Sequence, residues 1–181
     1  MRLDYMRARI LDGLIDQIEI YDSVLSSTEV IERYDAFNES LVLDYGDAPA
    51  PYPVTLAENG ARHEAAGPTL GATRDAESNG IPSDNADADG ADEDGAAFGT
   101  IRAGALDATV TANVQNAPEG ANLDGWIDFN KDGSWGGPGE QIFASVDVTG
   151  GDNLLEFDVP SWALSGTTYA RFRVSSEGEL G

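Results

Sequence analysis

The sequence predicts an all-β protein built around an antiparallel β-sandwich, on three observations. From residue 96 onward, apolar and polar residues alternate in short runs. Turns rich in Gly, Asn and Pro separate these runs, which are too short for typical helices. Between residues 44 and 95, by contrast, there is almost no periodicity, so a long, acidic, loop-rich part should precede the sandwich.

The alternating runs give six expected strands, at 97–103, 106–114, 123–129, 141–148, 153–159 and 167–175. Three of them also predict which side chains share a face. These sets are Ala108, Val110, Ala112 and Val114; Ile142, Ala144, Val146 and Val148; and Ala170, Phe172 and Val174, which oppose Tyr169, Arg171 and Arg173.

The loop-rich part opens on turn and polyproline material at 44–53 and continues at 57–95 with Gly, Asn, Asp and Ala. A loop of about forty residues inside a compact domain is uncommon. We therefore expect it to stay mobile unless a ligand stabilises it.

Residues 1–40 predict a strand at 14–21 and then a helix. Ser26 and Glu29 have the spacing of a capping box, and an apolar stripe follows up to Asn38, formed by Val30, Ile31, Tyr34 and Phe37. One strand and one helix cannot bury a core alone. These residues are therefore expected to be the end of a larger domain.

Charge limits the partners. The chain has 33 Asp and Glu against 10 Lys and Arg, a net charge of −23. A polyanion gains no binding affinity from phosphate groups, which argues against nucleic acid and anionic lipid as partners and favours cations. There is no apolar run of about 18 residues, so no membrane insertion is expected. Without Cys, and with His63 as its one His, the chain can form neither a thiolate site nor a His-based metal triad.

The densest acidic cluster lies at 84–95, where six of the eleven positions from 84 to 94 are acids. Asp87, Asp89 and Asp92 alternate around Gly90, which permits a tight turn and lets several oxygens face one point. Ca²⁺ takes six to eight oxygens and accepts irregular shells, so this pattern predicts a calcium site. A solvated acidic loop is the alternative.

A second calcium loop is predicted at 124–140. Asp128, Asn130 and Asp132 precede Gly133 with the spacing of the first half of an EF-hand loop, and Glu140 supplies a later acid. The flanks are typical of strands, so we expect a calcium loop on a β-scaffold. The alternative is a metal-free hairpin in which Asp128 and Asp132 accept hydrogen bonds from their own backbone.

Several motifs occur in the order seen in the GEVED domain, a β-sandwich module of large secreted or surface bacterial proteins. They span residues 44–181: Asp44-Tyr-Gly-Asp-Ala-Pro, Gly60-Ala-Arg-His63, Leu70-Gly-Ala, Asp75-Ala-Glu77, Asp89-Gly-Ala-Asp-Glu-Asp-Gly95, Gly125-Trp-Ile-Asp-Phe-Asn-x-Asp-Gly-x-Trp135, Gly139-Glu-Gln-Ile-Phe143 and Tyr169-Ala-Arg-Phe-Arg-Val174. The Gly-Glu-Val-Glu-Asp stretch that names the family is missing after Ser175-Ser-Glu-Gly, so we expect a truncated closing strand and a fragment of a longer protein.

The resemblance implies a non-enzymatic module that depends on calcium. Matched residue by residue, the implied ligands are Asp89, Asp92, Glu93, Asp94, Asp128, Asn130, Asp132 and Glu140, with Asp44 and Asp47 as further candidates. Arg62 and His63 match as well, and we expect them to tie the loop to the sandwich.

Residues 11–30 resemble the closing strand and helix of laminin-G-like, concanavalin-type domains, in the stretch Leu11-Asp-Gly-Leu-Ile-Asp-Gln-Ile-Glu-Ile-Tyr-Asp-Ser-Val-Leu-Ser-Ser-Thr-Glu-Val30. The resemblance implies that residues 1–40 are the C-terminal remnant of such a sandwich. Residues 41–181 are then the GEVED-like, calcium-binding sandwich.

Three functions remain open at this point. The first is an extracellular structural or adhesion module that binds Ca²⁺ and contacts neighbouring surface modules. The second is carbohydrate binding, with Trp126, Trp135 and Trp162 as stacking platforms, although a Trp in an alternating strand is usually core. The third, a glycosidase with two carboxylates, needs an acid in an apolar pocket, and the acidic clusters here are polar and Gly-rich.

Overall fold

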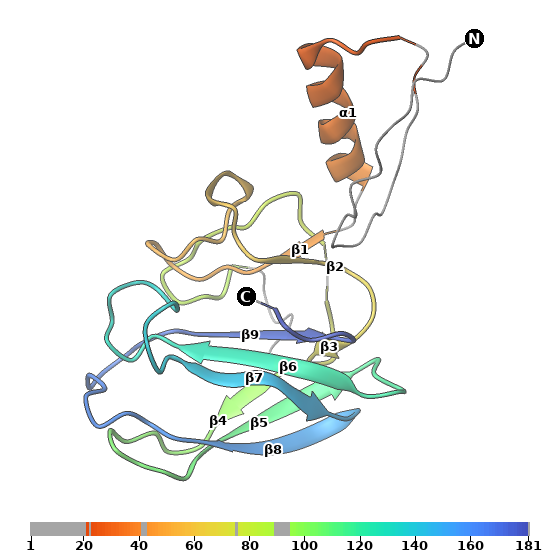
Figure 1. The fold of residues 1–181 in the computed structure, drawn as a ribbon. Helices are drawn as coiled ribbons and strands as arrows, with labels where there is room; N and C mark the ends of the chain where they lie inside the picture. Colours follow the sequence, from red (N-terminus) through yellow and green to blue (C-terminus); the bar gives the residue numbers. More distant parts are fainter. Residues whose placement is uncertain (1–20, 22, 41–42, 75, 89–94, 181) are drawn as a thin grey trace, which may run out of the picture. The chain divides into compact units, whose positions relative to one another are not determined.

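The chain divides into two units, Met1–Ser40 and Leu41–Gly181, and each is described by itself. In the computed structural model, the residues described are 21, 23–40, 43–74, 76–88 and 95–180 (Figure 1). The predicted strand at 14–21 lies outside these residues, apart from Tyr21.

The first unit contains helix α1 (Ser27–Ser40). The hydroxyl of Ser26 accepts the N–H of Glu29 at 3.2 Å, and the Glu29 carboxylate accepts the N–H of Ser26 at 2.8 Å. This confirms the predicted capping box, which satisfies donors at the helix start. Val30 and Ile31, from the predicted apolar stripe, are 52% and 58% exposed. In the part of the chain that the structure describes, no helix has both the length and the apolar character of a membrane span.

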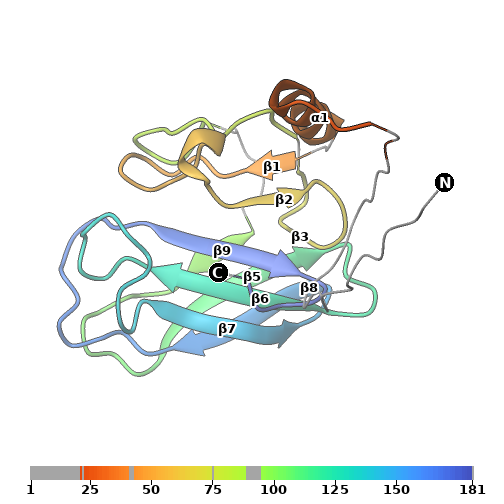
Figure 2. The ribbon, with the colours of Figure 1, turned by 45° about the horizontal axis from the view of Figure 1, so that its top comes forward.

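The second unit is an antiparallel β-sandwich, as predicted (Figures 1 and 2). In one sheet, β5 (Ala108–Gln115) pairs along one edge with β8 (Gly151–Phe157) and along the other with two short strands, β3 (Thr69–Leu70) and β4 (Ala96–Phe98). In the other sheet, β6 (Ala121–Ile127) lies between β7 (Gln141–Val148) and β9 (Ala170–Ser175). A separate pair is formed by β1 (Leu43–Tyr45) and β2 (Arg62–Glu64).

The core lies between the two larger sheets. Val110, Ala112 and Val114 of β5 are fully buried, which confirms the face predicted for this strand. Leu123 of β6 is also fully buried and joins the same cluster. The predicted inward face of β9 is confirmed too, with Ala170, Phe172 and Val174 packed in this cluster.

The face predicted for β7 is wrong at Ala144, which is exposed, whereas Phe143 is buried. The cause is a β-bulge: Ser145 has φ = 49°, and the register with β6 shifts between Leu123 and Gly125. One extra residue reverses the alternation along a strand. The carboxylate of Asp124 accepts the N–H of Ser145 at 2.8 Å and thereby supports the bulge.

The strand expected at 97–103 is shorter in the structure, where β4 ends at Phe98. Gly99 still donates its N–H to the carbonyl of Thr109, but Gly104, at φ = 80°, donates to the carbonyl of Val159 instead. The intervening chain therefore leaves the edge of β5.

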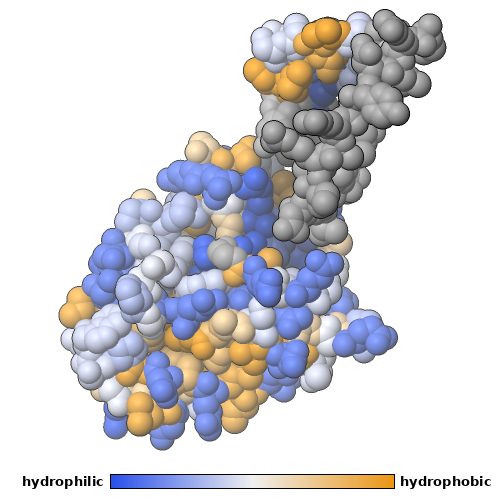
Figure 3. Space-filling view, viewed as in Figure 1, coloured by the Kyte–Doolittle hydropathy of each residue, from blue (hydrophilic) through white to orange (hydrophobic). Residues whose placement is uncertain are grey.

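The surface is largely hydrophilic on the face seen in Figure 3, with apolar patches over the lower part of the sandwich. Exposed apolar side chains of the second unit include Leu106 and Leu154, at 75% and 69% exposure. Such isolated apolar residues are normal on a folded protein.

The loop-rich segment covers the outer face of the β7–β6–β9 sheet, so β6 is buried on both faces. Beside β1 and β2 it contains a 3₁₀ helix, η1 (Leu56–Glu58), which a capping box at Thr55 begins. Gly60 and Gly80 both lie against the backbone of Val54, where an added Cβ would stand 2.3 Å from its atoms. This close packing explains the glycines at 60 and 80.

Gly125→Ala tests the packing of the core. An added Cβ would lie 3.0 Å from ring atoms of both Phe143 and Phe172, so we expect a loss of about 1–3 kcal/mol in the free energy of unfolding. Urea denaturation measures this loss. Gly46→Ala is the control, since nothing lies within 4 Å of its Cβ position, and an equal effect in both variants would contradict the packing described.

Candidate metal centre

The candidate centre lies in the loop between β6 and β7. Two backbone bonds close the base of this loop: Ile127 donates its N–H to the carbonyl of Glu140 at 2.9 Å, and Asp128 donates to the carbonyl of Tyr169 at 3.1 Å. Because of the first bond, Glu140 lies beside Asp128 although twelve positions separate them in the sequence.

The loop brings three carboxylates together. One oxygen each of Asp128, Asp132 and Glu140 lies within 4.8 Å of the other two. Asp128 and Glu140 are 0% exposed, whereas Asp132 is exposed. The sequence prediction therefore named residues that the fold does cluster, and Asn130 belongs to the same turn.

The hydrogen bonds of the loop are those expected of a metal-free hairpin. Asp132 donates its N–H to Oδ1 of Asn130 at 2.8 Å, and Gly133 donates to Oδ2 of Asp128 at 2.9 Å. Ser134 donates to Oδ1 of Asp132 at 2.9 Å. Such turns form without a ligand. The positions of Asp128, Asn130 and Asp132 thus do not by themselves require a metal.

Glu140 differs from Asp128 and Asp132 in the hydrogen bonding of its carboxylate. Its Oε2 accepts the N–H of Gly137 at 2.7 Å, while its buried Oε1 has no hydrogen-bond partner among the described groups. The close approach requires glycine at 137, where a Cβ would lie 2.5 Å from Oε2. A buried polar atom without a partner is costly, and a water molecule or a cation can offset that cost.

Electrostatics at Glu140 point the same way. Burial raises the pKa of Glu140, and the charges of Asp128 and Asp132 raise it further, whereas the backbone amides of Gly137 and Asn130 partly oppose the rise. Ionisation of Glu140 therefore costs more in this site than it does in water. A cation bound between the three carboxylates would stabilise that form. Carboxylate and amide oxygens are donors that suit Ca²⁺.

Tyr52, from the loop-rich segment, holds the buried carboxylate of Asp128. Its hydroxyl donates to Oδ2 at 2.5 Å, and its ring stacks on Trp135 with centroids 4.3 Å apart. Burial and then the bond to Asp128 raise the pKa of Tyr52, which keeps the hydroxyl protonated as a donor. The sequence analysis missed this residue. No local pattern could have found it, since 76 positions separate the two side chains.

The loop-rich segment does not place its described candidates in a comparable cluster. The carboxylate of Asp47 accepts the N–H of Ala88 at 2.8 Å, and Asp87 pairs with the hydroxyl of Ser83. Asp44 lines a pocket described next. The other predicted ligands of this segment, Asp89, Asp92, Glu93 and Asp94, lie outside the described residues.

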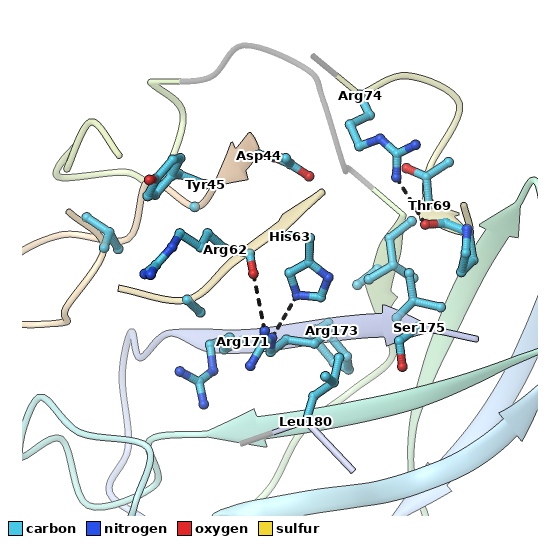
Figure 4. Close-up of a pocket in the computed structure, with 18 of the residues that line it drawn as sticks. Asp44, Tyr45, Arg62, His63, Thr69, Arg74, Arg171, Arg173, Ser175 and Leu180 are labelled. Atoms are coloured by element: carbon cyan, nitrogen blue, oxygen red, sulfur yellow. Dashed lines mark hydrogen bonds between the residues drawn. The ribbon is translucent and has the colours of Figure 1, made fainter. Parts of the chain in front are cut away.

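A pocket of about 850 Å³ lies between the β1–β2 pair, the 66–74 segment and β9 (Figure 4). In its wall, Nε2 of His63 accepts the Nε–H of Arg173 at 2.8 Å. A terminal N–H of Arg173 donates to the carbonyl of Arg62 at 3.5 Å. Arg62 and His63 thus tie the loop to the sandwich, as predicted. Burial, together with Arg173, Arg74 and Arg171, lowers the pKa of His63 to about 4.

The fold and the loop together define a β-sandwich module with an acidic turn between β6, the central strand of its sheet, and β7, an edge strand. Residues 122–180 match the family model of the GEVED domain, which confirms the predicted resemblance for this part of the chain. The match covers most of β6, the Asp128–Glu140 loop and strands β7 to β9. Searches of curated proteins and of solved structures find no match. The laminin-G-like assignment of residues 1–40 stays a prediction.

Tyr52→Phe tests the bond to Asp128. The variant removes one hydrogen bond to a buried carboxylate, so we expect a loss of about 1.5–3 kcal/mol in the free energy of unfolding. Chemical denaturation measures the loss. The matched control is Tyr169→Phe, whose hydroxyl donates to the carbonyl of Asp84 at the surface. Equal losses in the two variants would contradict a special role for the Asp128 bond.

His63→Gln tests the pH dependence. Because the folded-state pKa of His63 is about 4, below its ordinary value of 6.5, the unfolded chain binds the proton more readily. The stabilising contribution is complete above pH 6.5 and is lost as the pH falls toward 4. A Gln oxygen can still accept the Arg173 N–H but does not titrate. Unfolding free energies at pH 7 and 4.5 should differ less in the variant, and an unchanged difference would refute this account.

Proposed function

We propose that residues 41–181 form a non-enzymatic extracellular module, structural or adhesive, whose Asp128–Glu140 loop binds Ca²⁺. The observation that carries this proposal is the fully buried Glu140, whose Oε1 has no hydrogen-bond partner among the described groups and which lies in a cluster with two further carboxylates. In this proposal the ligands are Asp128, Asn130, Asp132 and Glu140.

Calcium fits this donor set better than magnesium does. Mg²⁺ demands a near-ideal octahedron and keeps several waters, whereas Ca²⁺ accepts an irregular shell of protein oxygens. Three carboxylates over-neutralise one divalent ion by a single charge. The exposed position of Asp132 leaves room for water to complete the shell.

The acidic segment at 84–95 is proposed as a second calcium-binding region, with Asp87, Asp89, Asp92, Glu93 and Asp94 and with Asp44 and Asp47 as candidate ligands. Six acids in eleven positions repel one another, and divalent cations relieve that repulsion. Asp47 lies beside this segment, at Ala88, which supports its inclusion.

Carbohydrate binding by stacking of sugar rings on tryptophan side chains has less support. Trp126 and Trp135 are only 6% and 7% exposed, and the guanidinium of Arg171 lies over both rings. Trp162 alone of the three tryptophans is substantially exposed, at 48%. A glycosidase is disfavoured because its proton donor needs a raised pKa and access to substrate. Among the described acids the pKa is raised at Glu140, but this residue is fully buried.

Calcium should raise the melting temperature of the full chain by several degrees. A ligand present at a hundred times its Kd stabilises the native state by about 2.7 kcal/mol. Glu140→Gln should abolish the rise from this loop and also make the calcium-free protein more stable, because it removes a carboxylate whose pKa is raised by burial. Differential scanning calorimetry with millimolar Ca²⁺ or with excess chelator measures both effects.

Glu156→Gln serves as the control, since Glu156 is an exposed acid on β8. It should keep the calcium response of the unaltered chain. Identical melting curves with calcium and with chelator in the unaltered chain would refute calcium binding. A full rise of the melting temperature with calcium in Glu140→Gln would show that the calcium site lies outside this loop.

A further inference from the structure

The few cations of the second unit gather at one place. Residues 41–181 contain 24 acids and six basic residues, a net charge of 6 − 24 = −18. Four of the six basic residues line the pocket beside β9, namely Arg62, Arg74, Arg171 and Arg173. In a unit so rich in carboxylates, each arginine would ordinarily be expected to form an ion pair with a nearby Asp or Glu.

Arg171 is the clearest exception to that outcome. Its guanidinium lies over the rings of Trp126 and Trp135, 4.5 and 5.0 Å from their centroids, and its buried Nε has no hydrogen-bond partner among the described residues. Within the described chain, no carboxylate pairs with it. Burial, with a smaller effect of Arg173, lowers its pKa from an ordinary value of 12.5, yet an arginine remains charged at neutral pH. The two aromatic faces fix its position while its donors remain available.

Arg62 and Arg74 use their hydrogen bonds on neutral groups. Arg62 donates to the side-chain oxygen of Asn59 and the carbonyl of Gly60, and Arg74 donates to the carbonyls of Ala66 and Pro68, at 3.2–3.3 Å. These bonds orient the guanidinium groups but do not neutralise them. Figure 4 shows Arg62 and Arg171 at one end of the pocket and Arg74 at the other, with His63 and Arg173 between them.

Three of the arginines act on His63, whose pKa is lowered first by burial and then by the charges of Arg173, Arg74 and Arg171. Four carboxylates also line the pocket, those of Asp44, Asp47, Glu64 and Glu177. With His63 neutral, the described residues of the lining carry 4 − 4 = 0 net charge, against −18 for the unit as a whole. An anion therefore meets less repulsion from these lining residues than from the acidic surface of the unit in general.

We propose that this pocket binds a monoanionic sugar acid of the hexuronate class, with its carboxylate on Arg171. Arginine pairs with carboxylates through parallel N–H bonds. The lining carboxylates accept sugar hydroxyls and repel ligands with several charges. A volume of about 850 Å³ lies in the range of small-molecule sites. Recognition here uses charge and hydroxyl groups, so it does not depend on a free tryptophan face or on the calcium loop.

The test is a titration of the full chain with D-glucuronate and D-galacturonate, followed by isothermal calorimetry and by NMR of the His63 ring. D-Glucose, D-galactose, acetate and inorganic phosphate are the comparison probes. All titrations contain chelator and are repeated in Glu140→Gln, so that a failure of the calcium proposal leaves this test intact. A bound carboxylate should raise the pKa of His63, because it offsets the neighbouring arginines.

We expect a uronate to bind, and Arg171→Gln to weaken that binding about tenfold or more. Arg62→Gln, at the same end of the pocket, should weaken it less, and Arg102→Gln, an exposed arginine outside the pocket, should not change it. If Arg171→Gln fails to fold, Arg171→Lys keeps the charge but loses the paired N–H bonds and should still reduce affinity.

Several outcomes would overturn the proposal. One is the absence of uronate binding, and another is equal affinity for the neutral sugars. Acetate or phosphate binding as tightly as uronate would show that a bare anion, and no sugar, is recognised. Binding that survives in Arg171→Gln with an unchanged His63 pKa would place the ligand elsewhere.

Discussion

The buried carboxylate of Asp128 is the interaction on which the second unit depends. Its side chain accepts hydrogen bonds from Tyr52 in the loop-rich segment and from Gly133 in its own loop. Its backbone carbonyl accepts the hydroxyl of Thr168, and its N–H donates to Tyr169. One residue thus joins three stretches of chain that are far apart in sequence. Because a buried charge is costly without partners, each of these stretches must be in place for the others to be stable.

Sequence patterns predicted the sandwich well where each strand keeps a regular alternation. The buried face of β5 follows directly from Ala108, Val110, Ala112 and Val114. The prediction failed at β7, because a bulge at Ser145 depends on the carboxylate of Asp124 across the sheet. Alternation alone carries no information about such a partner.

The same distinction holds at the candidate metal centre. Asp128, Asn130 and Asp132 could be predicted because their spacing is local, and Glu140 because it closes the same loop. Tyr52 could not, since only the packing of the loop-rich segment on β6 brings it there. The arginine pocket was also missed. Its members come from β2, the 66–74 segment and β9, and in the sequence they are separate residues in an acidic background.

The burial of β6 on both faces has a consequence for the extent of the folding unit. The match to the family model begins at residue 122, but Trp126, Trp135 and Asp128 are covered from outside by residues that precede it by seventy positions or more. A protein trimmed to the matched region would expose two tryptophans and leave a buried carboxylate without its phenol partner. In physical terms the module is therefore three layers thick, with the loop-rich segment as its third layer, and the region that matches the family model begins inside the folded unit.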